Sequence, residues 1–330
     1  MVTQEQIARK LGISRQLVTF ALAGYPQVSA ASRKRILAAA QKMGYRPNPH
    51  ARALKRGRTG IIGLWVPDQI SSHYTRVARE LNHLAKKSRH ELIITDVGND
   101  RSAKQVLTNV PMDGVFAVDA AHAVQAHFES AATHAIPVVS MGAQKTEQTD
   151  YVQVDLLAGA AKAMQHLITA GFRRIVHATF EKTSHASATR RLGYEQAMKQ
   201  AGLKPEFFYY PLSELQRPIV RQSIQAYIRE QGCPEAIFCH SDDVALGIYR
   251  GLCDLKLKVP RDVALVGCDG IQDTEYLESQ LTTLVQPVTQ MCELAWQFLT
   301  QRLENPKLKR QQAVLEPELV IRESSGFSPA

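Results

Sequence analysis

The spacing of apolar residues is helical over the first 45 positions of the chain. Apolar residues recur there every three or four positions and predict three short helices: 3–11, a second from Ser14 to about Leu22, and 30–43. Ser14 and Ser29 suit the N-caps of the second and third helices, because a serine hydroxyl can accept a hydrogen bond from a first-turn amide. Two helices joined by a short turn containing Gly12 indicate a helix-turn-helix.

From residue 60 the pattern changes to short β-rich runs that alternate with helical stretches. The predicted strands are Ile61–Val66, Glu91–Asp96, Gly114–Val118, Pro137–Met141, Val152–Val154, Arg174–Ala178, Ala236–His240 and Val263–Gly267. Helices fit between them, for instance over Tyr74–Lys87, Leu157–Ala170 and Ala188–Ala201. Such alternation predicts an α/β fold with parallel sheets covered on both faces. The run DGVFAVD before IPVVSMG resembles PEAIFCHSDD before DVALVGCD, so we expect two doubly wound lobes of similar topology.

Charge separates the helical head from the rest of the chain. The first 58 residues carry twelve Lys or Arg and one acid, Glu5, a net charge of +11 (12 − 1). The other 272 residues carry 28 Lys or Arg and 30 Asp or Glu, a net charge of −2 (28 − 30). Because polyanion binding is driven largely by phosphate neutralisation, the concentrated positive charge predicts that the head binds nucleic acid.

The second predicted helix has one face for packing and one face for DNA. Its DNA-facing residues are Arg15, Gln16, Thr19 and Phe20. A recognition helix meets base edges with its first turn, where arginine suits guanine and glutamine suits adenine. Phe20 can touch a thymine methyl or instead pack on a neighbouring helix, and the sequence leaves both readings open. The alternative for Arg15 and Gln16 is that they are polar first-turn residues that contact only solvent.

Several sequence runs closely resemble the lactose-repressor (LacI/GalR) family of bacterial transcription regulators. In the head and the following segment these are IARKLGISRQLVTFAL, VSAASRKRILAAAQKMGYRPN and ARALKRGRTGIIGLWVPD. Further motifs follow in the family's order: DGVFAVD, IPVV, GFRRI, RRLGY, VPRDVALVGCD and LTTLVQP. The resemblance covers about residues 3–323. It implies an all-α helix-turn-helix head followed by a periplasmic-binding-protein-like body of two doubly wound parallel-sheet lobes.

The resemblance also implies a division into domains. Residues 1–45 would be the DNA-binding domain, 46–59 a hinge, and 60–330 a body for effector binding and dimerisation. Lobe one would comprise about 60–154 plus 286–312, and lobe two about 155–284 plus 313–323. A homodimer would bind a pseudo-palindromic double-stranded DNA operator, and a small-molecule effector would change the operator affinity.

The hinge is expected to contact the minor groove. By resemblance, Leu54 wedges into the central base step beside Ala51, and Lys55 and Arg56 hold phosphates. A flexible basic linker is the alternative for this segment. Ser14, Ser29 and Asn48 complete the expected DNA-contacting set.

Candidate effector residues follow predicted strands or begin helices: Tyr74, Asp155, Arg190, Ser241 and Asp269. Arginine and carboxylates placed in this way bind hydroxyl-rich ligands through charge-assisted hydrogen bonds. In the family the positions of Arg190 and Asp269 bind the effector, which is commonly a sugar. Ser241 stands where the family usually has Asn, which weakens the expectation of a standard sugar. For Asp155 the alternative role is to cap a loop. For Asp242, which follows Ser241, the alternative role is to cap a helix.

Other functional classes lack support in the sequence. His240, Ser241 and Asp242 are adjacent and cannot form a nucleophile–base–orienter triad, so no catalytic residue is assigned and no enzyme is expected. There is no phosphate-binding glycine loop and no metal-ligand spacing, so neither a cofactor nor a metal is expected. The five cysteines lack CxxC spacing and read as buried free thiols.

No apolar run approaches the length of a bilayer span and no signal peptide precedes the head, which favours a cytoplasmic, nucleoid-associated protein without a membrane partner. Two alternatives to an effector-controlled repressor remain open. One is a DNA-binding regulator that responds to no small molecule or to a protein partner. The other is a small-molecule binder or enzyme whose basic head is incidental.

Overall fold

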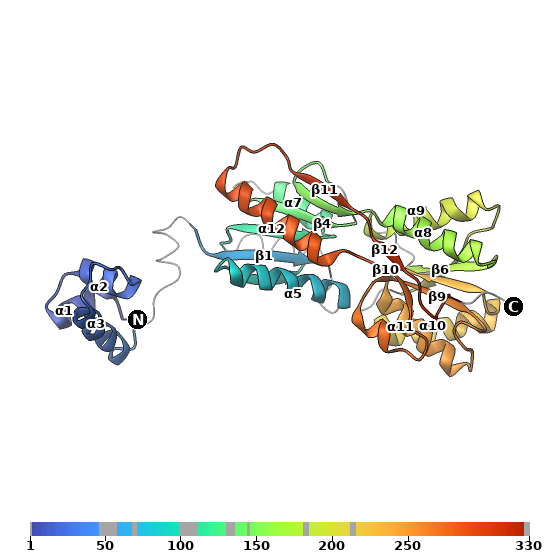
Figure 1. Cartoon of the computed structure of the whole chain (residues 1–330), viewed down its shortest axis with the longest axis horizontal. Helices are drawn as coiled ribbons and strands as arrows, with labels where there is room; N and C mark the ends of the chain where they lie inside the picture. Colours follow the sequence, from blue (N-terminus) through green and yellow to red (C-terminus); the bar gives the residue numbers. More distant parts are fainter. Residues whose placement is uncertain are drawn as a thin grey trace. The chain divides into compact units, whose positions relative to one another are not determined.

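The computed structural model separates the chain into two compact units, Met1–Thr59 and Gly60–Ala330, here called the head and the body (Figure 1). It describes residues 2–45, 58–67, 71–98, 111–129, 136–143, 146–180, 185–211 and 216–326. The residues 46–57 that contain most of the predicted hinge lie outside this set, and so do the expected DNA contacts Asn48, Ala51, Leu54, Lys55 and Arg56.

The head is a bundle of three helices with well-defined ends: α1 Gln4–Leu11, α2 Arg15–Ala23 and α3 Ala30–Lys42. Thr3 and Gln6 form a capping box at the start of α1, and Gly12 ends α1 in the left-handed region at φ 64°. The hydroxyls of Ser14 and Ser29 accept hydrogen bonds from Leu17 N and Ser32 N. Each serine cap stabilises its helix by about 1 kcal/mol.

The core of the head comes from all three helices. The buried side chains are Ile7, Ala8, Val18, Ala21, Val28, Ile36 and Ala40. The buried residues of α2 are three positions apart and those of α3 four, as expected for one face of a helix, while Ile7 and Ala8 are adjacent in α1 and Val28 precedes α3.

The body contains two six-stranded sheets, which we call lobe one and lobe two. The first has the strand order β2-β1-β3-β4-β5-β11, and the second β7-β6-β8-β9-β10-β12. All pairings are parallel except that of β12 with β10. The repeated motifs form β3 and β4 in lobe one and β8 and β9 in lobe two, which occupy the same places in the two sheets. The predicted fold class is confirmed.

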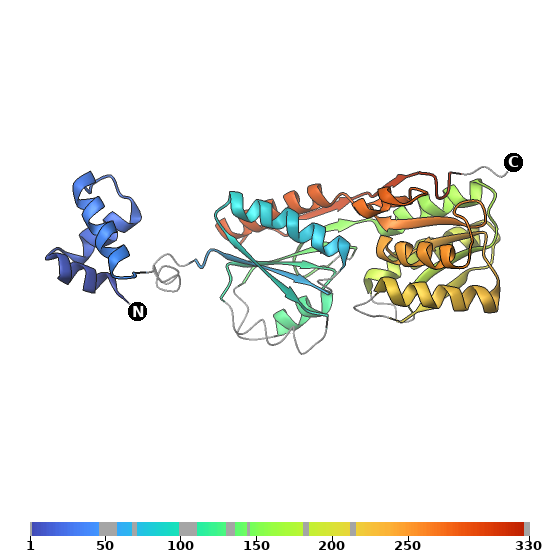
Figure 2. The ribbon, with the colours of Figure 1, turned by 90° about the horizontal axis from the view of Figure 1, so that it is seen from below.

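In lobe one, α5 and α12 cover one face of the sheet and α7 the other (Figure 2). Its elements are β1 Ile61–Val66, α5 Ser72–Lys87, β2 Glu91–Asp96, β3 Gly114–Val118, α7 Ala121–Glu129, β4 Val138–Gly142, β5 Asp150–Val154, α12 Val288–Glu304 and β11 Gln312–Leu315.

In lobe two, α8 packs on α9 on one face of the sheet, and α10 packs on α11 on the other (Figures 1 and 2). Its elements are α8 Leu156–Thr169, β6 Ile175–Phe180, α9 His185–Gln200, β7 Glu206–Tyr210, α10 Gln216–Gln231, β8 Ala236–Cys239, α11 Asp242–Asp254, β9 Ala264–Asp269, η1 Gln272–Tyr276, β10 Thr282–Val285 and β12 Glu318–Val320.

The chain passes between the two sheets three times: after β5, after β10 and after β11. The first and third connections touch, since Asp155 N donates to Leu315 O at 2.8 Å. One apolar core cluster includes side chains from both lobes, such as Leu64 and Val266.

The cysteines depart from the prediction in one respect. All five are free thiols, but only Cys239, Cys268 and Cys292 are buried. Cys233 follows α10 and is half-buried, and Cys253 is exposed because it lies on the outer face of α11, three residues after the exposed Arg250.

Candidate functional site: a recognition helix and an interlobe cluster

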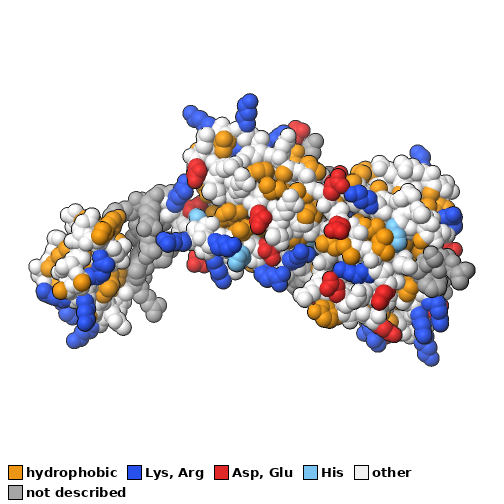
Figure 3. Space-filling model, in the orientation of Figure 1, with side chains coloured by type: hydrophobic (Ala, Val, Ile, Leu, Met, Phe, Trp, Pro, Cys, Tyr) orange, Lys and Arg blue, Asp and Glu red, His pale blue; other side chains and the backbone are white. Residues whose placement is uncertain are grey.

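The first turn of α2 presents two polar side chains to solvent. Arg15 and Gln16 are exposed directly after the Ser14 cap, while Val18 and Ala21 on the opposite face are buried. On the face visible in Figure 3, the described part of the head shows Lys and Arg, whereas basic and acidic groups are mixed over the body. Exposed first-turn groups on a basic head fit contact with base edges and phosphates.

The other two predicted reading residues on α2 have partners inside the head. The Thr19 hydroxyl donates to Gln4 Oε1 at 2.8 Å and to Arg15 O at 3.0 Å. Phe20 is half-buried, and its ring lies 5.2 Å from the ring of Tyr25. Phe20 thus packs against Tyr25, a neighbour that the sequence did not identify, and its contact with a thymine methyl stays a prediction.

In the body, charged and polar side chains from both lobes meet at the boundary between the two sheets. We call His73, Tyr74, Asp119, Arg190 and Asp269 the interlobe cluster. An Arg190 guanidinium nitrogen lies 3.9 Å from Asp269 Oδ1, and His73 Nδ1 lies 4.0 Å from the same oxygen. The Tyr74 hydroxyl donates to Asp119 Oδ2 at 3.3 Å. The fold thus brings side chains that are far apart in the sequence together at the boundary between the two lobes.

Asp269 is held in a fixed position by its neighbours. Gln286 Nε2 donates to Asp269 Oδ1 at 2.7 Å, and the backbone of Asp269 has a φ of 128°. The adjoining loop is fixed by Asp242, whose carboxylate accepts from Ile271 N and the Thr283 hydroxyl. Gly267 is required there, because a Cβ atom would come within 2.1 Å of Asp242 Oδ1.

Burial shifts the titration of the charged groups in and around the cluster. Desolvation raises the pKa of Asp242 and that of Asp269 to about 7. Desolvation lowers the pKa of His73 to about 4 and that of His240 well below its usual value. The two histidines are therefore neutral near pH 7, and Arg190 is the only basic member of the interlobe cluster as defined.

Two further contacts join the lobes at this boundary. Ser72, in the first turn of α5, donates from its hydroxyl to Asp243 Oδ1 at 2.8 Å, and Arg217 bonds the same carboxylate. Arg76 on α5 donates to Gly270 O at 3.0 Å, directly after Asp269. The interlobe cluster is thus flanked by hydrogen bonds that depend on the arrangement of the lobes.

Comparison with known proteins gives the same picture. Residues 3–48 match the family described as bacterial regulatory proteins, lacI family, and residues 164–325 match the periplasmic binding protein-like domain. The ribose operon repressor of Haemophilus influenzae is 29% identical over 98% of this chain and 98% of that protein. Catabolite control protein A of Priestia megaterium is 27% identical over 98% of this chain and 99% of that protein.

The chain belongs to the lacI family of bacterial regulatory proteins. Its fold matches the lac repressor dimer bound to operator with a TM-score of 0.80 at 20% identity, over 98% of this chain and 99% of that one. It also matches a lacI-family regulator of Enterococcus faecium with bound ribose with a TM-score of 0.73 at 22% identity, over 80% of this chain and 98% of that one. This lacI-family protein is a DNA-binding transcriptional regulator and not an enzyme.

The predicted effector residues of this lacI-family protein fall into two groups. Tyr74, Arg190 and Asp269 lie in the interlobe cluster. Asp155 and Ser241 are helix N-caps: Asp155 Oδ1 accepts from Ala158 N, and the Ser241 hydroxyl accepts from Val244 N. Ser241, and not Asp242, caps α11. Ligand contact remains a prediction for all five residues.

Sequence reasoning missed two members of the interlobe cluster, His73 and Asp119, and three polar groups near it, Tyr210, His240 and Gln286. Asp119 and His240 directly follow strands β3 and β8, so the strand-end rule that selected Asp269 applies to both. For His73 and Tyr210 only their burial in the folded body draws attention to them.

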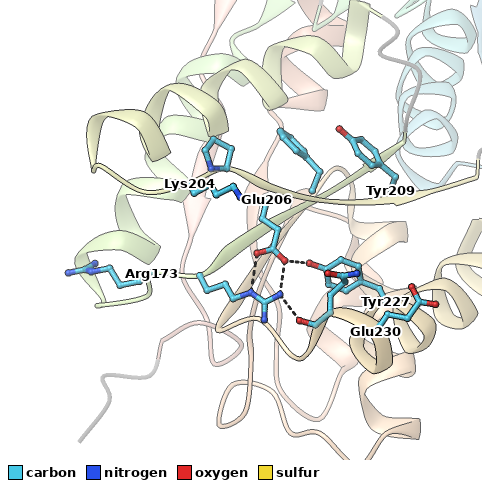
Figure 4. A pocket seen from close by; sticks show the side chains of 10 residues that line it. Arg173, Lys204, Glu206, Tyr209, Tyr227 and Glu230 are labelled. Carbon is cyan, nitrogen blue, oxygen red and sulfur yellow. Dashed lines mark hydrogen bonds and ion pairs between the residues drawn. The ribbon is translucent and has the colours of Figure 1, made fainter.

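Lobe two of this lacI-family protein also has a hollow of about 770 Å³ beside the edge strand β7, with Arg173, Lys204 and Tyr209 on its wall (Figure 4). Its central charges already satisfy one another. Arg174 forms two bonds to Glu206, at 2.7 and 3.0 Å, and the Tyr227 hydroxyl bonds the same carboxylate.

Within the described part of the chain, no helix is long and apolar enough to cross a bilayer.

Proposed function

We propose that this protein is a homodimeric, sequence-specific repressor whose affinity for a pseudo-palindromic operator is changed by a small polar effector at the interlobe cluster. The observation that carries the proposal is the combination of an exposed, basic recognition helix in the head with a buried charged cluster between the two lobes of the body. We further propose that it acts in the cytoplasm on the nucleoid, where its DNA partner is found.

On the DNA side, Arg15 and Gln16 would read base edges in the major groove of each half-site. Ser14, Thr19 and Ser29 would contact the backbone or flanking bases. Leu54 would wedge into the central minor-groove step, and Lys55 with Arg56 would neutralise phosphates. A two-fold dimer presents two such heads, which is why the operator is expected to be a pseudo-palindrome.

On the effector side, the relatives point to carbohydrates. The curated relatives include ribose operon repressors, and the structural neighbours include regulators with bound ribose and with bound cellobiose. Arg190 and Asp269 can supply charge-assisted hydrogen bonds to the hydroxyls of such a ligand.

Control would come from the arrangement of the lobes. An effector that bonds Tyr74 in lobe one and Arg190 in lobe two binds one lobe arrangement more tightly than another. Differential binding of this kind couples the two sites by about 1–3 kcal/mol, or about 5- to 150-fold in operator affinity. Bound near a promoter, the repressor would exclude the polymerase.

The test is selection of random duplex DNA by the purified full-length protein at about 150 mM salt, where purely electrostatic binding is weakened. We expect a two-fold symmetric site with a constant central step. The Arg15→Ala/Gln16→Ala double variant serves as control and should retain only non-specific binding. Equal enrichment of unrelated sequences by the native protein would contradict site-specific repression.

A regulator of the same fold that answers to a protein partner is the alternative. A carbohydrate that raises the melting midpoint and changes operator affinity separates the two, since only a ligand of the native state raises the midpoint.

A further inference from the structure

The turn after the recognition helix presents an aromatic ring to solvent. Helix α2 ends at Ala23, and Gly24 follows it in the left-handed region at φ 78°. The next residue, Tyr25, is 48% exposed. Among the described residues of the head, Leu37 is the only other large apolar side chain that is exposed. Tyrosine supplies a large contact area with only two rotatable side-chain bonds, so Tyr25 is suited to contact another molecule.

Backbone hydrogen bonds hold Tyr25 in place. Its N–H donates to Phe20 O at 3.1 Å, and its carbonyl oxygen accepts from Val28 N at 3.3 Å and from an Arg33 guanidinium nitrogen at 2.5 Å. The Tyr25 ring packs against the Phe20 ring, with 5.2 Å between the ring centres and 57° between the planes. Such a bond, joined by an apolar contact between the same two residues, is a common ending of a helix at glycine. The ring is therefore ordered before it meets a partner, so binding costs little side-chain entropy.

Tyr25 extends the surface that α2 presents for reading DNA. Arg15 and Gln16 are exposed in the first turn, and the half-buried Phe20 lies one turn after Gln16 on the same face. Because Tyr25 packs on Phe20, this surface continues past the end of the helix, from Gln16 through Phe20 to Tyr25. The exposed ring thus adjoins the predicted base-reading side chains.

The charge of the head allows a DNA duplex to approach this turn. Glu5 is the only acid among the first 58 residues, and it lies 3.5 Å from Arg9 on α1. Residues 24–29, which form the turn, carry no charged side chain, and the Arg33 guanidinium lies directly beside them. No carboxylate of the turn therefore repels the phosphates, and no charge has to be desolvated when the turn meets a base pair.

An aromatic ring in the major groove has one apolar partner among the base edges. All four base pairs offer hydrogen-bond donors and acceptors there, and only thymine adds an apolar group, its 5-methyl group. Covering that methyl group removes apolar surface from water, which is favourable, and cytosine offers no equivalent. The helix ending requires only an apolar side chain at position 25, and the exposed part of the Tyr25 ring goes beyond that requirement.

We propose that Tyr25, although it lies outside the recognition helix, reads the 5-methyl group of a thymine in each half-site, with its ring held in place by the turn and by Phe20. This inference rests on the proposed function, which requires site-specific binding and assigns no base to Tyr25. The thymine should lie beside the base that Gln16 reads, because Gln16, Phe20 and Tyr25 follow one another along the surface.

The first test removes the methyl group and nothing else. The duplex selected by the native full-length protein is synthesised with deoxyuridine in place of thymidine at one symmetric pair of positions at a time. Fluorescence anisotropy at about 150 mM salt measures the affinity. We expect one such pair to weaken binding by about 15-fold, since each buried methyl group contributes about a factor of four. A loss below fivefold at every pair, or a selected half-site without thymine, overturns the proposal.

The second test identifies the residue that senses the methyl group, by the ratio of affinities for the thymine and uracil duplexes. Tyr25→Leu keeps an apolar contact with Phe20 but lacks the outer part of the ring. We expect its melting midpoint to stay near that of the native protein and its ratio to fall below threefold. Tyr25→Phe keeps the whole ring and should retain the native ratio. Leu37→Ala is the matched control, since Leu37 is exposed on α3 of the same head, and it should also retain the ratio.

Two results with these variants would contradict the proposal. A native ratio in Tyr25→Leu would assign Tyr25 to the ending of the helix alone. A lost ratio in Tyr25→Phe would assign the effect to the hydroxyl group and not to the ring.

The selection itself separates this inference from the proposed function. If the native protein enriches no sequence, site-specific repression and the reading of thymine are both wrong. If it enriches a two-fold symmetric site whose binding is insensitive to every thymine methyl group, site-specific binding stands and only the role of Tyr25 is wrong.

Discussion

The recognition surface of the head and the interlobe cluster of the body are built on opposite principles. The residues of the recognition surface are neighbours in sequence on one short helix, and Arg15 and Gln16 remain exposed. The members of the interlobe cluster lie up to 196 positions apart (269 − 73), and Arg190 and Asp269 are buried. Changes to the first surface should therefore alter DNA binding and leave folding intact, whereas changes to the second should alter both ligand binding and stability.

The largest effect is expected from Arg190→Leu. It leaves the Asp269 carboxylate buried without its cation, and breaking a buried pair in this way lowers the free energy of unfolding by about 3–5 kcal/mol. Urea denaturation followed by circular dichroism measures this value. The contrasting variant is Arg15→Leu in the head, which should stay within about 0.5 kcal/mol of the native protein. Similar losses in both variants would erase the distinction between the two surfaces.

The pH dependence of stability provides a second probe of the cluster. Burial lowers the pKa of His73 from 6.5 to about 4, so the unfolded chain takes up its proton first as the pH falls. The contribution of His73 is thus present above pH 6.5 and lost on the way to pH 4. Its size is at most about 3.5 kcal/mol, since one pKa unit corresponds to about 1.4 kcal/mol.

Asp242 and Asp269 act in the opposite sense, because their raised pKa values make the folded protein less stable as the pH rises from about 4 to about 7. The native protein and His73→Leu share the contributions of Asp242 and Asp269, so these cancel when the stabilities of the two proteins are subtracted at each pH. We expect melting midpoints to show that His73→Leu gains on the native protein as the pH falls from 6.5 to 4.5. A constant difference over that range would mean that His73 titrates normally.

In the head, Gln16→Ala should weaken operator binding by about 1–3 kcal/mol, the discrimination of one good base contact, with an unchanged melting midpoint. Fluorescence anisotropy on the operator and on random DNA measures the effect. Equal losses on both kinds of DNA would assign Gln16 to backbone contact.

A modest change in stability, well below that of Arg190→Leu, is expected from Ser14→Ala. It removes the hydrogen bond to Leu17 N and should lower the stability of the head by about 1 kcal/mol. Ser29→Ala provides a matched comparison, since Ser29 caps α3 in the same way. Since both serines are expected to contact DNA, each substitution should weaken operator binding beyond the loss of stability. A loss of stability alone would assign that serine to capping only.

The ease of predicting each element from sequence follows its length and its position in the sheet. Strands β1, β2 and β3 have the predicted bounds, because each is a β-rich run of five or six residues next to a helical pattern. Strand β7 was missed, as were β10, β11 and β12, which have only three or four residues each. So short a run carries no clear period, and its position is set by pairing with a distant strand.

The candidate site was predictable to the extent that it follows a rule of strand ends or of family resemblance. Arg190 and Asp269 were selected in this way, and the structure brings them to within 3.9 Å. The burial of His73 and Tyr210 arises from contacts across the whole body, so no local pattern contains it.

The three passages of the chain between the sheets have a consequence for engineering. Since neither lobe is encoded by one uninterrupted stretch of gene, a chimera that exchanges a lobe between relatives must exchange at least two separate segments and preserve three junctions. Cutting the chain at one of these crossings would keep both sheets whole and leave two covalent connections between the lobes. Such a split protein would show how many connections the signal between ligand and operator requires.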